Sequence, residues 1–399
     1  MRTTIDARTK GFTRLRAVIA CLGLAAWAGL CPAPALADPS HLECGSVITT
    51  STTLRYDLSD CPGDGLIVGT DGITINLNGH TVGGDGVPNT QRPDAGIRVD
   101  GHHRVAISNG SVTGFDLDVL FTAAPEGAVT ALTVEHSRRG IVFVDRSDRA
   151  RIIGNVASNN GGPDGGAGIL LLGSSGATIR GNTLTGNHVG VALNNGSNGN
   201  SVFGNKFSDN HELALEINFS DDNIVTSNRI TGSNGGVSLE SANSTIVSRN
   251  TISRATGPDG MGIQIYGDDN TVSHNTVTDS IRYGIEVDDF QDPGHSPITG
   301  NLLQENVVHQ GGIGIAIGPE AGGVVLNTRI ERNLLTGAQA DGIQLVGPST
   351  GLETSILTNN ITVHNRQLGI NALPGTIDGG GNRANGNGDP RQCLNILCR

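Results

Sequence analysis

The chain has 399 residues, of which 36% are hydrophobic and only 3% aromatic, with 59 glycines and a formal net charge of −12. The acidic balance argues against nucleic acid as a partner. Many glycines and few aromatic residues fit tight turns and thin interior layers better than one large core. Apolar residues recur in register along the chain, which excludes disorder as the explanation for so much glycine.

Residues 1–37 have the pattern of a secretory signal peptide. Five basic residues precede an apolar run over residues 17–30, and Ala35-Leu36-Ala37 forms a small-x-small cleavage site. The run is shorter than the roughly 20 residues that span a bilayer, and no later segment approaches that length. We therefore expect a secreted or periplasmic protein without an integral membrane segment. It begins near Asp38 and carries a net charge of −16 after cleavage.

Cysteine pairs lie near both ends of the mature chain. Four cysteines permit three disulfide connectivities, and the close spacing within each pair favours Cys44 with Cys61 and Cys393 with Cys398. Residues 38–70 and 386–399 are expected to form caps, because the end coils of a solenoid otherwise expose open sheet edges.

Residues 71–385 carry a repeat in which an Asn is followed two residues later by an apolar residue. The repeat occurs at Asn182, Asn205, Asn228, Asn250, Asn275, Asn306, Asn333 and Asn359, with separations of 22 to 31 residues. Such a period is typical of a solenoid coil. We expect these Asn residues to adopt the left-handed turn conformation and to bond the equivalent amide in the next coil.

Each repeat also contains a short alternating apolar strand that follows a Gly, as in Gly190-Val191-Ala192-Leu193, and a third strand before the Asn turn. Three short strands in each coil cannot bury their apolar faces alone, but parallel stacking of the coils buries them. The pattern predicts an all-β, single-stranded parallel β-helix of about 12 coils. The rule for parallel crossovers makes it right-handed.

The mature chain resembles exported bacterial right-handed β-helix repeat proteins of the pectin-lyase-like superfamily. The resemblance rests on Cys44-Gly45-Ser46-Val47-Ile48, on Asp71-Gly72-Ile73-Thr74-Ile75-Asn76-Leu77-Asn78-Gly79-His80 and on Gly386-Asn387-Gly388-Asp389-Pro390. It implies a polysaccharide or a cell-surface glycan as partner. The group contains lyases, hydrolases, epimerases and members without an established reaction, so the activity stays open.

Strand alternation predicts which side chains face outward. One predicted outward column contains Asn194, Glu216, Glu240, Tyr266 and Asp288, and the column beside it contains Ala192, Ala214, Ser238, Gln264 and Glu286. Side chains in one column lie about 5 Å apart in adjacent coils and about 10 Å apart when one coil separates them. The distances between the two catalytic carboxyl groups of glycosidases fall within this range. Glu216 with Glu240, or Glu240 with Asp288, is therefore a candidate acid and base pair, with Glu286 beside them. A chance alignment of outward polar residues is the alternative.

Further candidates surround this column. Tyr266 and Tyr283 are candidates for stacking on sugar faces, with Gln264 beside them. Arg282 is a candidate because lyases of the superfamily commonly abstract a proton with an Arg. Acidic turns after these strands supply Asp222, Asp268, Asp269 and Asp289 as candidate calcium ligands. Asp is also an ordinary turn residue, so a structural role stays open.

The longest coil contains an irregular stretch from Tyr283 to His295 that we expect to form a lid or specificity loop. It loosely resembles the active-site motif of mannuronan epimerases, which makes His295 a candidate for proton transfer, although Glu286-Val287 intervene. Another β-helix group, linked to nitrous oxide reductase maturation, shares the fold. Met261 is the only methionine of the mature chain, which argues against copper handling.

Two functions follow from these observations. The first is a monomeric, polysaccharide-directed enzyme, namely a lyase, hydrolase or epimerase. The second is a non-catalytic surface or adhesive β-helix, which the absence of tryptophan from the mature chain favours.

Overall fold

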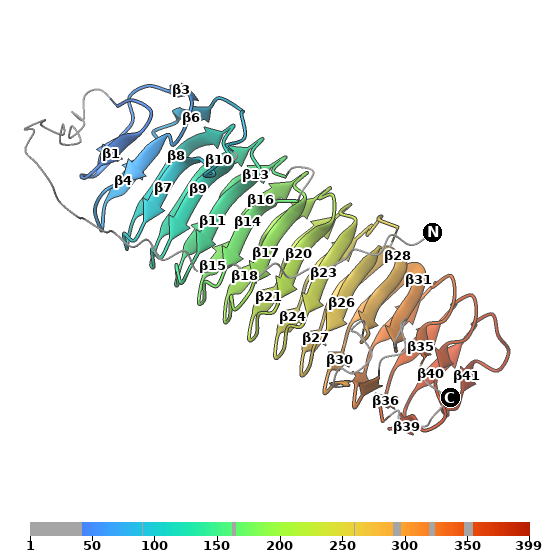
Figure 1. The fold of residues 1–399 in the computed structure, drawn as a ribbon. Coiled ribbons are helices and arrows are strands. Elements are labelled where there is room, and N and C mark those ends of the chain that lie inside the picture. The colour runs from blue at the N-terminus through green and yellow to red at the C-terminus, as the bar shows by residue number, and fades with distance from the viewer. Residues whose placement is uncertain are drawn as a thin grey trace, which may run out of the picture. The chain divides into compact units, whose positions relative to one another are not determined.

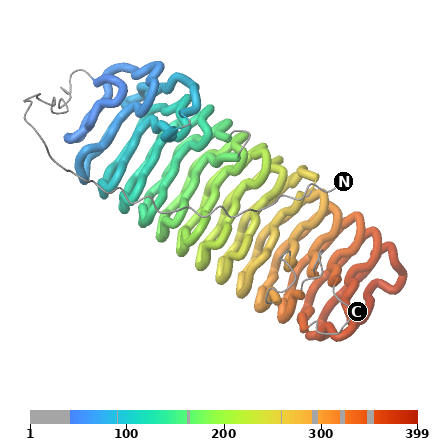
Figure 2. The backbone as a smooth tube through the Cα atoms, in the orientation of Figure 1, coloured from blue at the N-terminus to red at the C-terminus, as the bar shows by residue number. Residues whose placement is uncertain are grey.

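The computed structural model describes residues 42–89, 91–161, 165–258, 260–289, 297–318, 324–346 and 354–399. The predicted signal peptide and His295 lie outside these residues. The described residues belong to one compact unit. Within its described part every regular element is a strand, and the strands stack into a parallel β-solenoid (Figure 1). Successive coils follow one another along the tube in Figure 2.

The first sheet contains the Gly-led strands and is the sheet that positions the candidate site. Its strands are β1 (Ser46–Ile48), β4 (Leu66–Val68), β7 (Ala95–Asp100), β9 (Leu117–Thr122), β11 (Arg139–Val144), β14 (Ala167–Leu172), β17 (Val189–Asn194), β20 (Leu213–Asn218), β23 (Gly235–Glu240), β26 (Met261–Tyr266), the ends of β28 (Thr276–Val287) and β31 (Val307–Ile317), β35 (Ile343–Leu345), β38 (Ile370–Asn371) and β41 (Cys393–Leu394).

The second sheet contains β2 (Thr52–Thr53), β5 (Thr74–Asn76), the starts of β8 (Ala106–Thr113) and β10 (Ala128–Glu135), β12 (Arg151–Ile153), β15 (Thr178–Arg180), β18 (Ser201–Phe203), β21 (Ile224–Thr226), β24 (Ile246–Ser248), β27 (Thr271–Ser273), β30 (Leu302–Gln304), β33 (Arg329–Glu331), β36 (Ile356–Thr358) and β39 (Ile377–Asp378). A separate parallel pair joins β29 (Ile298–Thr299) to β32 (Val325–Leu326).

The third sheet contains β3 (Leu58–Cys61), β6 (Thr81–Gly84), the ends of β8 and β10, β13 (Val156–Ser158), β16 (Thr183–Thr185), β19 (Lys206–Ser208), β22 (Arg229–Thr231), β25 (Thr251–Ser253), the starts of β28 and β31, β34 (Leu334–Thr336), β37 (Ile361–Val363) and β40 (Arg383–Asn385). Because all three sheets pair in parallel from coil to coil, the backbone hydrogen bonds run along the solenoid.

The solenoid has about 14 turns, because 14 parallel pairings connect the first sheet from β1 to β41. The sequence motifs predict about 12. The difference arises at the ends, where β1 to β4 and β41 lie in the segments expected to be caps and lack the Asn motif.

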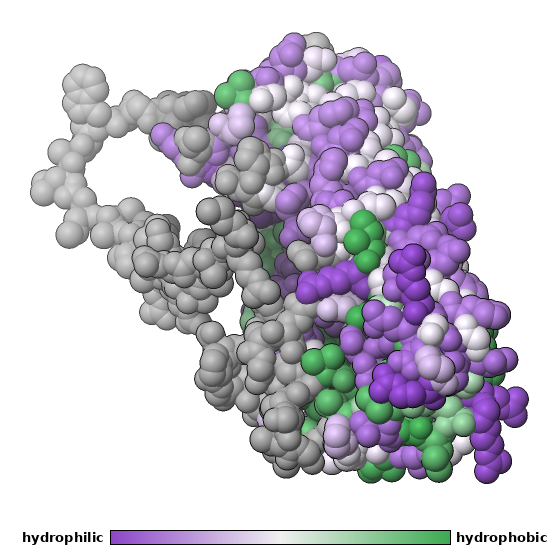
Figure 3. Space-filling view, turned by 90° about the vertical axis from the view of Figure 1, so that its right-hand side faces the viewer, coloured by the Kyte–Doolittle hydropathy of each residue, from purple (hydrophilic) through white to green (hydrophobic). Residues whose placement is uncertain are grey.

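The core is a stack of small aliphatic layers. Fully buried side chains at equivalent strand positions face one another through the coils, as Ile141, Ile169 and Val191 do in β11, β14 and β17. Phe121 and Phe143 add one stacked ring pair with centroids 4.3 Å apart. Outside, the face in Figure 3 is mostly hydrophilic with scattered apolar residues. No helix in the described part of the chain is long and apolar enough to cross a membrane.

The buried Asn column forms the predicted amide ladder. The Nδ2 group of Asn182 donates to Oδ1 of Asn205 at 3.0 Å, and Asn205 donates to Asn228 at the same distance. The backbone N–H groups of Asn182 and Asn205 donate to the same two oxygens at 2.9 and 3.0 Å. Each ladder oxygen thus accepts two hydrogen bonds, and these polar groups are satisfied inside the fold.

Two details of the predicted ladder are wrong. The residue before each ladder Asn adopts the left-handed conformation instead, as Ser227 does with φ 56° and Arg249 with φ 55°. Asn359 is another such preceding residue, and the ladder amide belongs to Asn360, which bonds Asn382 at 3.1 Å. The motif misleads there because Thr362 replaces the apolar residue at the inward position.

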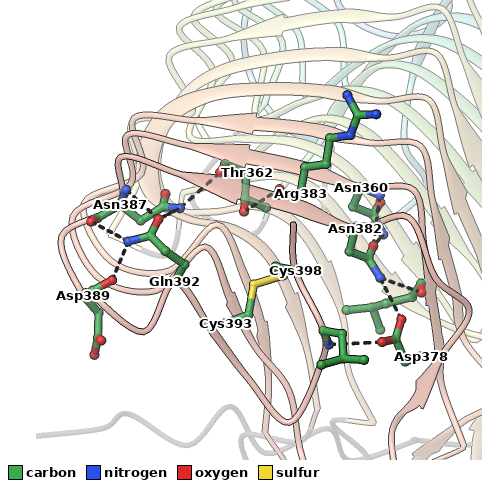
Figure 4. The surroundings of a disulfide bond; sticks show 12 residues. Asn360, Thr362, Asp378, Asn382, Arg383, Asn387, Asp389, Gln392, Cys393 and Cys398 are labelled. Carbon is green, nitrogen blue, oxygen red and sulfur yellow. Dashed lines mark hydrogen bonds between the residues drawn. A yellow bond between two sulfur atoms is a disulfide. The ribbon is translucent and has the colours of Figure 1, made fainter.

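Both predicted disulfides are confirmed, Cys44 with Cys61 and Cys393 with Cys398. Figure 4 shows the second disulfide beside the last Asn pairs of the ladders. There Oε1 of Gln392 accepts from Nδ2 of Asn387 at 3.0 Å, so a glutamine takes the place of the missing next-coil Asn.

Candidate functional site

The outward face of the first sheet carries two columns of side chains that run from coil to coil. We call them the central column and the side column. The central column contains Arg98, Leu120, Val142, Leu170, Ala192, Glu216, Ser238, Gln264, Glu286, Ala316 and Gln344. The side column contains Asp100, Thr122, Val144, Leu172, Asn194, Asn218, Glu240 and Tyr266.

The column assignment from the sequence is wrong for one strand. Glu216 pairs with Ala192 and Ser238 in the central column, whereas Asn218 occupies the side-column position between Asn194 and Glu240. The cause is local. Ala214 stands at the corner position that Gly occupies in neighbouring coils, and it is fully buried, so the expected Gly does not mark the start of this strand.

Glu216 and Glu240 nevertheless lie close together, because the Asn218 amide connects them. Its Nδ2 group donates to Oε1 of Glu216 at 3.4 Å and to Oε2 of Glu240 at 3.3 Å. The two accepting oxygens therefore lie within about 7 Å of each other, a range that includes the spacing of roughly 5 to 5.5 Å used by retaining glycosidases.

Burial and like charge shift both carboxyl groups. Burial, and next the negative charge of Glu240, raise the pKa of Glu216 to about 7. Burial, and next the charge of Glu212, raise the pKa of Glu240. A carboxyl group with a pKa near 7 can donate a proton at neutral pH, which an ordinary glutamic acid does poorly.

Two polar atoms at this place lack a hydrogen-bond partner among the described residues. They are the buried Oδ1 atoms of Asn194 and Asn218, adjacent in the side column. Buried acceptors are normally satisfied. These two atoms are therefore unsatisfied acceptors buried within the side column.

Toward the C-terminus the outward side chains bond one another. Ser238 Oγ donates to Oε1 of Gln264 at 3.1 Å, and Nε2 of Gln264 donates to Oε2 of Glu286 at 3.1 Å. Gln264 also bonds the Tyr266 hydroxyl. The structure thus brings Gln264, Tyr266 and Glu286 together, as the sequence predicts, next to the Glu216 and Glu240 pair.

Other predicted site residues lie apart from the pair. Asp288 continues the strand, because its backbone N–H donates to the Ile265 carbonyl at 3.1 Å. Its side chain is fully buried, and Oδ1 accepts from the backbone N–H of Asp289 at 2.8 Å. The Arg282 guanidinium lies over the Tyr283 ring, 5.0 Å from its centroid. Tyr283 pairs with Met261 at the other edge of the first sheet.

The four candidate calcium ligands do not converge. Backbone hydrogen bonds place the turn of Asp222 two coils from that of Asp268 and Asp269, about 10 Å away. Asp268 accepts from the backbone N–H of Thr299 at 2.7 Å, and Asp289 accepts from that of Val324 at 3.2 Å. Among the described residues no group of three or more His, Cys, Asp or Glu residues is arranged to hold a metal ion.

Sequence reasoning missed a groove on the same face, on the N-terminal side of Glu216. It has a volume of about 480 Å³, and its apolar lining includes Leu120, Val142, Leu170 and Val189. These residues form a second apolar cluster on the opposite face of the strands from the core. Alternation applied to the earlier Gly-led strands would have revealed the apolar column.

Several solved structures have a similar fold. A GH87 alpha-1,3-glucanase from Streptomyces thermodiastaticus strain HF3-3 aligns with a TM-score of 0.52 and 14% identity over 86% of this chain and 64% of that one. The tailspike protein of E. coli bacteriophage HK620 aligns with a TM-score of 0.56 and 12% identity, over 73% of this chain and 63% of the tailspike chain. A mannuronic acid specific polysaccharide family 6 lyase from human gut microbiota aligns with a TM-score of 0.54 and 12% identity, over 79% of this chain and 82% of the lyase chain.

At these identities the likeness shows the fold alone, and the chain spans less than two thirds of the glucanase and of the tailspike. No curated protein gives a significant match. A family model described as periplasmic copper-binding protein (NosD) matches residues 77–255, 168–311 and 215–371.

Among the described residues no group of three or more His, Cys, Asp or Glu residues could hold a copper ion. Copper(I) prefers thiolate and thioether ligands, but Cys44, Cys61, Cys393 and Cys398 all form disulfides. Met261 is the only methionine after residue 1, and its Sδ accepts from Gln264 at 3.0 Å. The sequence argues against copper handling for the same reason, because the mature chain has one methionine.

The three matches of the family model together extend from residue 77 to residue 371. The chain therefore belongs to the family of the periplasmic copper-binding protein NosD.

Proposed function

We propose that this protein is a periplasmic, polysaccharide-directed β-helix protein that hydrolyses glycosidic bonds at Glu216 and Glu240. The observation that carries the proposal is the pair of carboxyl groups held by one Asn218 amide, with the pKa of Glu216 raised to about 7. The family description supports the location, and the signal peptide, outside the described residues, stays a prediction.

In the proposed reaction Glu216 donates its proton to the glycosidic oxygen as the bond breaks. The Glu240 carboxylate attacks the sugar carbon from the other side and forms a glycosyl ester, and a water molecule deprotonated by Glu216 then displaces Glu240 and releases the sugar. The roles of Glu286, Gln264 and Tyr266 are then to bind the sugar that follows in the chain.

The test is turnover of soluble polysaccharides, including alpha-1,3-glucan oligosaccharides and mannuronan, by the purified protein. We expect new reducing ends without the absorbance at 235 nm that a lyase product shows. Glu216→Gln should reduce the rate at least 100-fold, as loss of a general acid does. Glu126→Gln is the matched control, because Glu126 is an exposed partner of Arg149 far from the pair.

A non-catalytic glycan-binding protein is the second candidate. It is favoured by the contacts of Ser238, Gln264 and Glu286, which bond one another as side chains of a purely structural column would. In that case the same polysaccharides bind without producing reducing ends, and Glu216→Gln changes only the affinity. Absence of both binding and turnover across the panel contradicts both candidates.

A further inference from the structure

The corner between the second and third sheets carries one exposed cation in each of four successive coils. The four are Arg180 at the end of β15, Lys206 at the start of β19, Arg229 at the start of β22 and Arg249 in the turn between β24 and β25. Each lies within two residues of an asparagine of the buried ladder, which fixes the backbone beneath it. We call these four cations the basic stripe. The second-sheet strands β15, β18, β21 and β24 of its coils follow one another along the lower edge of the solenoid in Figure 1.

No acidic residue shares this corner with the basic stripe. In six successive coils the second-sheet strand, the turn and the third-sheet strand contain no Asp or Glu, over residues 151–158, 178–185, 201–208, 224–231, 246–253 and 271–278. The acidic residues that the structure describes in these coils lie in the other two turns and on the first sheet, as Asp221 and Glu216 do. The stripe thus reverses the sign of charge locally on a strongly acidic protein.

The cations of the basic stripe form no ion pair with any of the described residues. Arg332 is different, although it occupies the same turn position as Arg249 three coils further on, because it pairs with Glu305 at 2.8 Å. Glu305 also pairs with His274 at 2.6 Å, and the acid-free corner ends there. Four like charges at steps of about 4.8 Å repel one another, and an anion bound along the stripe relieves this repulsion.

The geometry of the basic stripe favours a linear anion. Lys206 and Arg229 are direct partners in adjacent strands, with Arg180 one coil before them and Arg249 one coil after. The stripe is therefore one cation wide and about 14 Å long. Double-stranded nucleic acid carries one charge for each roughly 1.7 Å, which is much denser. An extended chain of acidic sugars carries one charge on each ring, and the length of a ring is comparable to the step between coils.

A row of hydroxyl groups beside the basic stripe suits the same ligand. One outward column of the third sheet contains Thr185, Ser208, Thr231 and Ser253. The oxygens of Thr185 and Ser208 lie 2.9 Å apart, and those of Thr231 and Ser253 lie 3.0 Å apart. Hydroxyl groups donate to carboxylate oxygens and exchange hydrogen bonds with sugar hydroxyls. The row therefore favours a hydroxyl-rich polymer over an anionic lipid surface.

We propose that the basic stripe binds a polyuronate, which is a linear polysaccharide with one carboxylate on each sugar ring. The polymer runs along the solenoid axis, and each cation faces one carboxylate. The stripe lies at the corner that the second and third sheets separate from the first sheet. A polyuronate bound there leaves Glu216 and Glu240 accessible and holds the protein on an acidic polymer. This binding site goes beyond the reaction proposed at Glu216 and Glu240 and does not depend on it.

The probes are galacturonate oligosaccharides and neutral maltohexaose, titrated calorimetrically into the purified protein at low ionic strength. We expect hexagalacturonate to bind and maltohexaose not to bind, and added salt should weaken the binding. The affinity should rise from digalacturonate to tetragalacturonate and little beyond, because the stripe has four cations. Lys206→Gln and Arg229→Gln should each weaken hexagalacturonate about 5-fold, as loss of one unit-charge pair in water does. The double variant should weaken it roughly 25-fold.

Arg383→Gln is the matched control. Arg383 is an exposed cation in the same outward column as Arg229, six coils further on, and it stands outside the basic stripe. Its loss should change the affinity less than about 2-fold. An equal loss in this variant, absence of hexagalacturonate binding, or equally strong binding of maltohexaose overturns the proposal.

Two further measurements identify the class of ligand and separate this proposal from the reaction. Anionic lipid vesicles or a single-stranded oligonucleotide that displaced hexagalacturonate at a lower concentration of charge would assign the basic stripe to another partner and overturn the proposal. Glu216→Gln should abolish polysaccharide turnover and leave the affinity for hexagalacturonate unchanged. Failure of either proposal is therefore seen separately.

Discussion

At the scale of single residues, Asp118 shows how the solenoid accommodates a carboxyl group in its interior. It stands in β9 between Leu117 and Val119, at the corner position that is Gly140 in the next coil. The residue is fully buried, its Oδ1 accepts from the Ser137 hydroxyl, and its Oδ2 is unpaired among the described residues. Burial raises the pKa of Asp118 well above the ordinary value of 3.8.

This raised pKa makes stability depend on pH. In the unfolded chain Asp118 ionises near pH 3.8, whereas the folded protein keeps the proton to higher pH. The folded state therefore binds more protons than the unfolded state. The contribution of Asp118 to the free energy of unfolding falls as pH rises above about 4. Asp118→Asn should gain stability over the wild type between pH 4 and 7. Urea unfolding at several pH values measures this, and parallel curves for the two proteins would contradict it.

Glu216 carries a prediction that does not depend on turnover. Its carboxyl carbon, observed by ¹³C NMR with labelled glutamate, should titrate near pH 7. Glu216→Gln identifies the signal by removing it. Glu240→Gln should move the midpoint to lower pH, because it removes the like charge that disfavours ionisation. A midpoint near 4.5 in the wild type would remove the basis for a general acid at this position.

At the scale of elements, the Asn ladder connects the turns between the second and third sheets. Asn228→Ala removes the oxygen that accepts from the backbone and side-chain N–H groups of Asn205. Leaving these two buried donors unpaired should destabilise the fold by about 2 to 4 kcal/mol. Arg229→Ala, at the adjacent exposed position, should change the stability by less than about 0.5 kcal/mol. Chemical denaturation of both variants measures the contrast, and equal effects would show that the ladder is dispensable.

The outward columns show where prediction of elements succeeds and where it fails. Alternation after each corner Gly predicts Ala192, Ser238 and Gln264 in one column, and the structure confirms them. A Cβ atom at Gly190 would lie 2.4 Å from the Ala214 carbonyl oxygen, which explains why Gly marks most corners. In β20 the corner is Ala214 itself. The Gly that marks the corner is absent there, so alternation predicts the wrong column for Glu216.

At the scale of the whole solenoid, the two disulfides fix the first and last coils. In the chain-entropy description, removing Cys44–Cys61 through Cys44→Ser and Cys61→Ser should cost about 3 kcal/mol, and removing the shorter Cys393–Cys398 loop about 2 kcal/mol. Proteolysis of the terminal coils and thermal unfolding measure both losses. If the C-terminal pair proves the more costly, a contribution other than loop entropy dominates.

The sequence by itself determined the features that repeat. Parallel stacking, the amide ladder and the stapled ends follow from motifs of a few residues, because a solenoid coil contacts mainly its neighbours and local period decides the fold. Only the tertiary structure decided which side chains meet on the outward face. The Glu216 and Glu240 contact through Asn218, the burial of Asp288 and the aliphatic groove depend on where each strand begins after its corner. A shift of two residues moves a side chain into the neighbouring column without disturbing the repeat.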